Sequence, residues 1–215
     1  MAVKGIIFDL DGTLVDTLDD LTDSMNAALN QLGRPGRSAH ECQEMIGHGL
    51  RRFAEGALGQ EHIQLADELI MRMVDYYKDH CLLKTTVYPG LGDVIAALSR
   101  QGVRLAVLTN KNQAPAEIIT CPYFGCEVFD PVVGAADGRK PKPDPQSTLD
   151  VISGWGLEKE EVLFVGDSET DVQTAINAGV RCLACQWGFR SKDQLIKAGA
   201  EILIQQPRKI LEYVG

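Results

Sequence analysis

The sequence of 215 residues lacks the features that direct a protein to large charged or lipid partners. It has no run of lysine and arginine, and its formal net charge of −9 repels nucleic-acid backbones and anionic membranes. No apolar stretch approaches the roughly 20 residues that a membrane-spanning helix needs. Asp9 and Asp11 interrupt the apolar run near the N-terminus, so we expect no signal peptide. We therefore expect neither a nucleic-acid nor a membrane partner, and a cytoplasmic location.

Cysteine occurs six times, but in no pattern that indicates a zinc site or a disulfide framework. Cys182 and Cys185 have the CxxC spacing, yet no second pair of ligands accompanies them, and they lie in an apolar stretch that predicts a strand. We expect the cysteines to be small buried side chains in a reducing compartment. The remaining composition, 45% apolar and 24% charged, is ordinary for a globular protein of one large domain with a modest insert.

Hydrophobic periodicity separates a helical region from the start of the chain. Residues 3–9 form a short apolar run that ends in carboxylates, which predicts a buried strand. From residue 16 to about residue 83, apolar residues recur at helical spacing and no segment predicts a strand. Ser38 and Glu41 have the spacing of a capping box, which should open a helix. Residues 16–85 are therefore predicted to form an all-helical domain.

From residue 87 onward, apolar strands alternate with helices. We expect strands near residues 103–108, 132–133, 162–165, 180–184 and 202–204, with helices between them. This alternation predicts an α/β fold, a Rossmann-like doubly wound parallel sheet with helices on both faces. Residues 1–15 and 86–215 would form this core domain, and residues 16–85 would be a helical domain inserted into it.

Reactive polar side chains gather where the predicted strands end. They lie in four segments: 9–13 (Asp-Leu-Asp-Gly-Thr), 109–111 (Thr-Asn-Lys), 140–145 (Lys-Pro-Lys-Pro-Asp-Pro) and 166–171 (Gly-Asp-Ser-Glu-Thr-Asp). The carboxyl ends of parallel strands meet at one edge of a sheet, where ligands bind. Carboxylates that cluster repel each other unless a cation intervenes, and an oxygen-rich ligand set favours a hard ion such as Mg²⁺. The lysine and the threonine hydroxyl suit an anion such as phosphate.

These four segments, in this order, resemble the four signatures of the haloacid dehalogenase superfamily, over residues 3 to about 190. The helical block falls where that superfamily places its helical cap. Within the superfamily the chain resembles the phosphoglycolate phosphatase branch. That likeness rests on Gly47-His48-Gly49-Leu50, Val87-Tyr88-Pro89-Gly90, residues 109–111, and Trp187-Gly188.

The resemblance implies catalytic and metal-binding roles for the aspartates. Asp9 would be the nucleophile that forms an aspartyl-phosphate, and Asp11 would be the general acid and then the general base. Side-chain oxygens of Asp9 and Asp167 and the backbone carbonyl of Asp11 would bind Mg²⁺. Asp171 would bind the metal through water or orient a lysine.

The resemblance also implies a set of phosphate-binding residues, which we expect to be Thr109, Asn110 and one lysine. Lys140 and Lys142 both fit the pattern Lys-Pro-x-Pro, so the lysine is not fixed by the pattern alone. We favour Lys142, which lies 25 residues before Asp167, a spacing typical of the superfamily.

Two residues of the helical block are candidates for substrate specificity. His48 lies between two glycines in a loop that the superfamily points toward its active site, and Arg51 could meet a second anionic group of a substrate. A surface turn and a solvated arginine are the alternatives. The oligomeric state, monomer or homodimer, is left open.

The sequence thus predicts a Mg²⁺-dependent phosphatase of small phosphorylated metabolites, with 2-phosphoglycolate as the first candidate. A mutase of the β-phosphoglucomutase type and a pyrophosphatase are the alternatives. Dehalogenation is disfavoured because Asp11 supplies an acid that an alkoxide leaving group needs and a halide does not. A non-catalytic binding protein is disfavoured because no signature residue is missing.

Overall fold

Six parallel strands form the central sheet of the computed structural model, which describes residues 2–214. Their order is β5-β4-β1-β6-β7-β8. The strands are β1 (Gly5–Phe8), β4 (Arg104–Asn112), β5 (Val132–Ala135), β6 (Val162–Gly166), β7 (Arg181–Cys185) and β8 (Ile202–Ile204). The chain order reverses at β1, between β4 and β6, and such a switch point is where open α/β sheets bind ligands.

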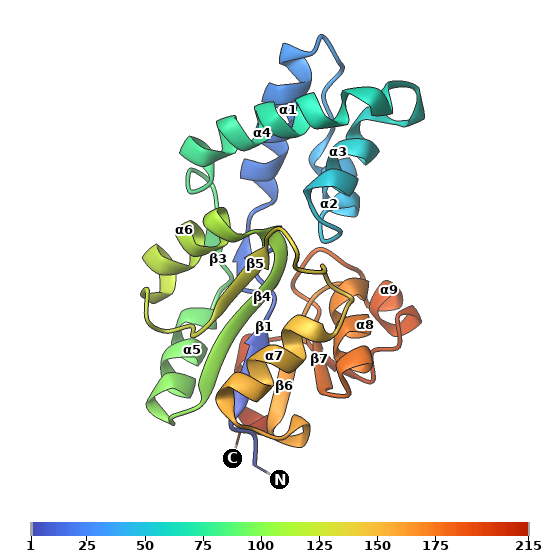
Figure 1. Cartoon of the computed structure of the whole chain (residues 1–215). Helices are drawn as coiled ribbons and strands as arrows, with labels where there is room; N and C mark the ends of the chain where they lie inside the picture. The colour runs from blue at the N-terminus through green and yellow to red at the C-terminus, as the bar shows by residue number, and fades with distance from the viewer. Residues whose placement is uncertain (1, 215) are drawn as a thin grey trace.

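Helices cover both faces of this sheet (Figure 1). Because side chains alternate along a strand, Ile6 and Phe8 of β1 belong to one apolar core and Ile7 to the other. The first core includes α5 (Leu91–Arg100), α6 (Gln113–Phe124) and the 3₁₀ helix η3 (Pro207–Tyr213); the second includes α7 (Gln146–Trp155) and α8 (Glu169–Ala178). The short helices η2 (Lys159–Glu161) and α9 (Lys192–Lys197) complete the core domain. The expected doubly wound α/β fold is confirmed.

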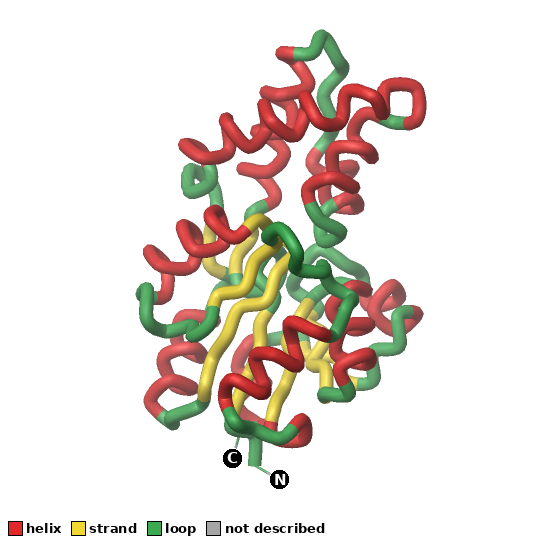
Figure 2. The backbone as a smooth tube through the Cα atoms, in the orientation of Figure 1, coloured by secondary structure: helices red, strands yellow, loops and turns green. Residues whose placement is uncertain are grey.

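An all-helical cap lies beyond the carboxyl ends of the strands, at the opposite end of the molecule from both termini (Figures 1 and 2). It consists of α1 (Leu18–Gln31), α2 (Ala39–Met45), α3 (Leu50–Leu58), η1 (Gln60–Leu65) and α4 (Ala66–His80). The side chain of Ser38 accepts a hydrogen bond from the backbone of Glu41, and this capping box starts α2 as the sequence predicts. The inserted helical cap is therefore present as expected.

The two chain segments that join cap and core are tied together. They form the antiparallel strands β2 (Val15–Asp16) and β3 (Thr86–Val87). The carboxylate of Asp20, 1% exposed in α1, accepts hydrogen bonds from the backbone N–H groups of Lys84 at 3.0 Å and Thr85 at 2.8 Å. The two segments that join cap and core thus form one narrow connection, and the first turn of α1 is hydrogen-bonded to it.

Several element boundaries differ from the sequence-based expectation. Strand β4 continues to Asn112, because a register shift after Leu108 restores its pairing with β5, so residues 109–111 lie inside the strand. Within the predicted helical block, η1 and α4 are separate elements, and His62 has a non-helical backbone. The last helix is a 3₁₀ helix.

The cysteines also require a correction. Cys121 and Cys126, at the end of α6, are joined in a disulfide, so the expectation of free cysteines fails for this pair. Cys42, Cys81 and Cys185 are free and buried, and Cys182 is free and partly buried. No helix within residues 2–214 has the length and apolarity to cross a membrane.

Candidate active site

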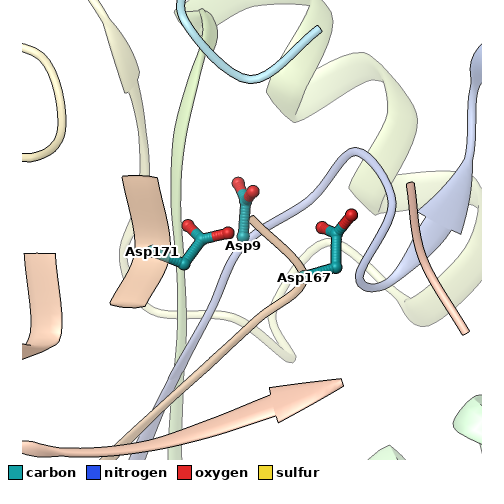
Figure 3. Close-up of side chains that lie close together, drawn as sticks. All are labelled: Asp9, Asp167 and Asp171. Atoms are coloured by element: carbon teal, nitrogen blue, oxygen red, sulfur yellow. The ribbon is translucent and has the colours of Figure 1, made fainter. Parts of the chain in front are cut away.

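Three buried aspartates meet at the carboxyl edge of the sheet. Asp9 follows β1, Asp167 follows β6, and Asp171 lies in the first turn of α8. One carboxylate oxygen from each lies within 4.8 Å of those of the other two, and all three residues are buried. Figure 3 shows Asp9 between Asp167 and Asp171. The fold therefore brings together the expected nucleophile Asp9 and the two expected carboxylates Asp167 and Asp171.

A lysine ammonium group lies inside this cluster. The Nζ atom of Lys142 is 2.8 Å from Oδ1 of Asp9 and 2.6 Å from Oδ1 of Asp171, and its side chain is 3% exposed. The side chain of Lys140 is 78% exposed and pairs with Asp144 instead. Burial opposes the charged form of Lys142, but Asp171 and Asp9 outweigh it and hold its pKa above the ordinary value. Lys142 is thus a fixed positive charge beside Asp9.

The carboxylate cluster has the electrostatics of a metal site. Burial raises the pKa of Asp9 well above its ordinary value, and it raises that of Asp167 to about 7, with Asp171 adding to both shifts. Among residues 2–214, the buried Oδ1 atom of Asp9 finds no aligned hydrogen-bond donor. Lys142 alone cannot balance three carboxylates, whereas a divalent cation that prefers oxygen ligands can. These residues therefore fit a metal ion.

Asp171 is engaged by protein groups on both oxygens. Its Oδ1 atom accepts from Lys142, and its Oδ2 atom accepts from the backbone N–H of Ser168 at 3.0 Å and from the Ser168 hydroxyl at 2.6 Å. This capping box fixes the start of α8. Of the two roles expected for Asp171, the arrangement favours orientation of the lysine.

Asp167 is held by two donors and faces a glycine. Its carboxylate accepts from the hydroxyl of Thr13 at 2.9 Å and from the backbone N–H of Phe189 at 2.7 Å. Gly12 has a φ of +85°, and a Cβ atom at this position would collide with the Asp167 carboxylate. The glycine after Asp11 is therefore required both by the turn and by the proximity of Asp167.

Asp11 lies beside the cluster and has its own cation. The Nζ atom of Lys111 is 2.9 Å from Oδ1 of Asp11, and the hydroxyl of Thr17 donates to the same oxygen at 2.7 Å. Lys111 also lies over the ring of Tyr77 in the cap, 4.7 Å from its centroid. Lys111 belongs to the predicted segment of residues 109–111, but no role was expected for its side chain. Its position two residues after Thr109 was the available signal, because alternate strand residues share a face.

The two expected phosphate-binding residues of β4 differ in what their side chains contact. Thr109 is 4% exposed, and its hydroxyl accepts from the backbone N–H of Lys111 at 3.2 Å. The amide of Asn110 donates to the carbonyls of Lys142 at 3.1 Å and Gly47 at 3.0 Å and accepts from the N–H of Lys142 at 2.8 Å. Asn110 thus positions the Lys142 loop and contacts the cap.

A cavity of about 310 Å³ lies between this edge of the sheet and the cap. Asp9, Asp11 and Thr109 line it from the core, and helices α1, α3 and α4 line it from the cap. A small molecule bound there would have its reacting group beside Asp9 and the rest of its surface against the cap. The geometry therefore assigns the chemistry to the core and contact with the rest of a ligand to both domains.

The two residues expected to set specificity do not line this cavity. The Nδ1 atom of His48 is 3.3 Å from the Thr170 hydroxyl, and burial together with Arg190 lowers the pKa of His48. The side chain of Arg51 is 59% exposed and pairs with Asp67 and, at 3.6 Å, with Glu55. Gly47 and Gly49, on either side of His48, do line the cavity. The loop around His48 therefore reaches the site, but the side chains of His48 and Arg51 contact other groups.

Arg190, which sequence reasoning missed, holds the cap against the core. It is 4% exposed and donates to the carbonyls of Gln43 at 2.7 Å and Ile46 at 2.6 Å, where α2 ends. Its Nε atom donates to Glu169 at 3.0 Å. A guanidinium group at a helix C-terminus satisfies carbonyls that have no partner within the helix. No pattern in the sequence could indicate this contact, because it joins residues about 145 positions apart.

The family model of the haloacid dehalogenase-like hydrolases matches residues 6–185, and the chain belongs to this family. It is 36% identical to phosphoglycolate phosphatase 1 of Pseudomonas aeruginosa, over 96% of this chain and 78% of that protein.

Two further comparisons cover nearly all of both chains. The N-acetylmuramic acid 6-phosphate phosphatase of the same organism is 29% identical, over 99% of this chain and 95% of that one. A solved structure of a candidate phosphoglycolate phosphatase from Lactobacillus delbrueckii superimposes with a TM-score of 0.90 at 30% identity, over 100% and 99% of the two chains. The protein is therefore a phosphatase of the haloacid dehalogenase-like family.

Proposed function

We propose that the enzyme hydrolyses a small phosphate monoester through an aspartyl-phosphate on Asp9, with Mg²⁺ as its metal. One observation carries the proposal: Asp9 lines the cavity while its carboxylate lies 2.8 Å from the buried ammonium group of Lys142. A carboxylate that is desolvated, oriented and exposed to a ligand cavity has the properties of a nucleophile.

The residues support two chemical steps. In the first, an Asp9 oxygen bonds to phosphorus, the bond from phosphorus to the ester oxygen breaks, and Asp11 donates a proton to the leaving alkoxide. In the second, Asp11 removes a proton from water, the water oxygen bonds to phosphorus, and the Asp9–phosphorus bond breaks to release phosphate. Lys111 and Thr17 hold the Asp11 carboxyl group, which would carry its proton into the first step and take one up from water in the second.

Lys142 and Thr109 would donate to the oxygens of the phosphoryl group, and Asp171 would act by holding Lys142 in place. Asp9, Asp167 and the backbone carbonyl of Asp11 would hold Mg²⁺. Bound there, the ion would supply further positive charge to the phosphoryl oxygens. Its hardness suits the all-oxygen ligand set, which supports Mg²⁺ over softer metals.

The division into domains is part of this proposal. We assign residues 1–15 and 86–215 to the core and residues 16–85 to the cap, with the β2–β3 pair as the connection. We also propose a cytoplasmic enzyme that binds no nucleic acid, in keeping with its net charge of −9. The relatives act, by their names, on different phosphate esters, and 2-phosphoglycolate is the first substrate to test.

The test is phosphate release from a panel of esters that includes 2-phosphoglycolate, sugar phosphates and pyrophosphate. Each would be assayed with Mg²⁺ and with EDTA, for the wild-type enzyme and for Asp9→Asn. We expect release from monoesters that needs the metal and is lost in the variant. Release that persists in Asp9→Asn, or no release from any folded wild-type sample with metal, would contradict the proposal.

A further inference from the structure

Apart from its catalytic edge, the active-site cavity is lined mainly by apolar side chains, which form an apolar wall. Six of the residues that form it come from both domains: Leu21 of α1, Leu50 and Phe53 of α3, Met73 and Val74 of α4, and Ile118 of α6. Helix α4 turns one side toward the cavity, since Met73, Val74 and Tyr77 all line it. The surface that meets the part of the substrate beyond its phosphate is therefore mostly hydrocarbon, with Tyr77, Lys78 and Asn112 among its polar residues.

Cations are scarce on this wall. Of the described residues that line the cavity, two carry a positive charge, Lys78 and Lys111, and none is an arginine or a histidine. Lys111 already pairs with Asp11 at 2.9 Å. Lys78 is an exposed residue toward the end of α4. A carboxylate pressed against the rest of this surface would lose its hydration without gaining a charged partner, which is costly.

Two apolar side chains of the wall remain open to water. Val74 is 44% exposed and Ile118 is 42% exposed, although both line the cavity, one from the cap and one from the core. Covering such side chains with a hydrocarbon group is favourable because apolar surface leaves water. A cavity of about 310 Å³ is at the lower end of the range for pockets that hold drug-sized ligands. It has room for more than a two-carbon acid.

We infer that the enzyme prefers phosphate monoesters whose leaving alcohol is an uncharged, largely apolar group of several carbons over esters whose alcohol carries a carboxylate. This inference rests on the proposed function, because it concerns the leaving group at the same site. The catalytic edge supplies all the charge that the phosphate needs, and the apolar wall selects the alcohol.

A series of straight-chain alkyl phosphates, from methyl to butyl, measures this preference. Their alcohols have nearly the same acidity, so the chemical step changes little along the series. If each added methylene group moves out of water and into contact with the apolar wall, kcat/KM should rise about fourfold per carbon, the equivalent of ~0.8 kcal/mol. Butyl phosphate should then exceed 2-phosphoglycolate.

Two matched variants of α4 locate the effect. Val74→Lys places a cation on the wall, so it should flatten the alkyl series and raise kcat/KM for 2-phosphoglycolate several-fold. Met71→Lys adds the same charge to the same helix, at a residue that is 64% exposed and outside the cavity lining. In this variant the rise in kcat/KM per carbon and the kcat/KM for 2-phosphoglycolate should both stay within about twofold of the wild-type values. Binding of butylphosphonate and phosphonoacetate by calorimetry gives the same comparison without turnover.

The possible results distinguish a failure of this inference from a failure of the proposed function. A flat alkyl series together with a preference for 2-phosphoglycolate that Lys78→Met removes would overturn the inference and leave the phosphatase intact. Tighter binding of phosphonoacetate than of butylphosphonate would overturn it as well. Absence of Asp9-dependent phosphate release from every ester would overturn the proposed function itself.

Discussion

Lys142 is the cation that two buried carboxylates share, and its neighbour in sequence, Lys140, lies on the surface. We expect Lys142→Met to lower kcat by about 10²–10³-fold, because it removes a preorganised donor to the phosphoryl oxygens. Lys140→Met should leave kcat within about twofold, since it loses an exposed ion pair alone. Steady-state kinetics of the two variants, with circular dichroism as a check of folding, measures the difference. Equal losses in both would contradict the assignment.

The raised pKa of Asp167 predicts how metal-free stability depends on pH. The ordinary pKa is 3.8, and burial and Asp171 raise it to about 7 in the folded protein. Between about pH 4 and pH 7 the folded protein therefore keeps a proton that the unfolded chain has lost, so the free energy of unfolding falls as pH rises. Mg²⁺ bound at Asp167, as we propose, would compete with that proton, so its affinity should rise over the same range.

Thermal unfolding of metal-stripped wild type and Asp167→Asn measures this effect. The amide does not ionise, so the Tm of the variant relative to that of the wild type should increase from pH 4.5 to pH 7 and level off above it. Mg²⁺ should raise the Tm of the wild type and leave the variant unchanged. Parallel Tm curves for the two proteins across this range would contradict the account.

At the residue level, sequence spacing predicted which side chains converge but not what each one contacts. Asp9, Lys142, Asp167 and Asp171 were found because strand ends meet at one edge of a parallel sheet. The amide of Asn110 is bonded to the backbone of Lys142 and Gly47, a result of loop packing that spacing does not encode. The same holds for Arg51, whose partners lie on its own helix and on α4.

Helix α2 shows how one element depends on another that is distant in sequence. Its last carbonyls accept from Arg190, and Gln43 donates to the carbonyl of Phe189 at 2.7 Å. Phe189 in turn donates its N–H to Asp167. A chain of hydrogen bonds thus connects the cap helix to an expected metal ligand.

Arg190→Ala should loosen this contact. It leaves buried carbonyls without a donor, which costs about 1–3 kcal/mol of stability, and Arg190→Lys should restore part of the loss. Arg208→Ala, at an exposed residue of η3, is the matched control and should be neutral. Chemical denaturation gives the stability, and limited proteolysis should show faster cleavage near α2 in the alanine variant alone. Unchanged stability and proteolysis would show that Arg190 does not hold the cap.

Helices and strands were predictable where one hydrophobic periodicity determined the type of element. The core strands and most cap helices follow hydrophobic repeats, and the capping box at Ser38 marks a helix start. The extension of β4 could not be predicted, because it depends on a register shift against β5. The β2–β3 pair is equally hidden in the sequence, since two-residue strands have no measurable period.

On the scale of the whole molecule, the cap is attached through one narrow connection and rests on the core through a second set of contacts near α2. The cavity lies between the two domains, with its catalytic groups on the core and most of its apolar wall on the cap. Changes in the cap should therefore alter which ester is used without altering the chemical steps. Such a separation would let the chemical steps stay the same while the cap selects the ester.

The proposed mechanism requires that Asp9 becomes phosphorylated during turnover. Enzyme mixed with substrate and Mg²⁺ would be quenched in acid and treated with borohydride, which reduces an acyl phosphate to an alcohol but leaves a free carboxylate unchanged. Mass spectrometry of the peptide that contains residue 9 should then show homoserine in place of Asp9, only when substrate was present. Homoserine at another aspartate, or unmodified Asp9 during demonstrated turnover, would contradict this mechanism.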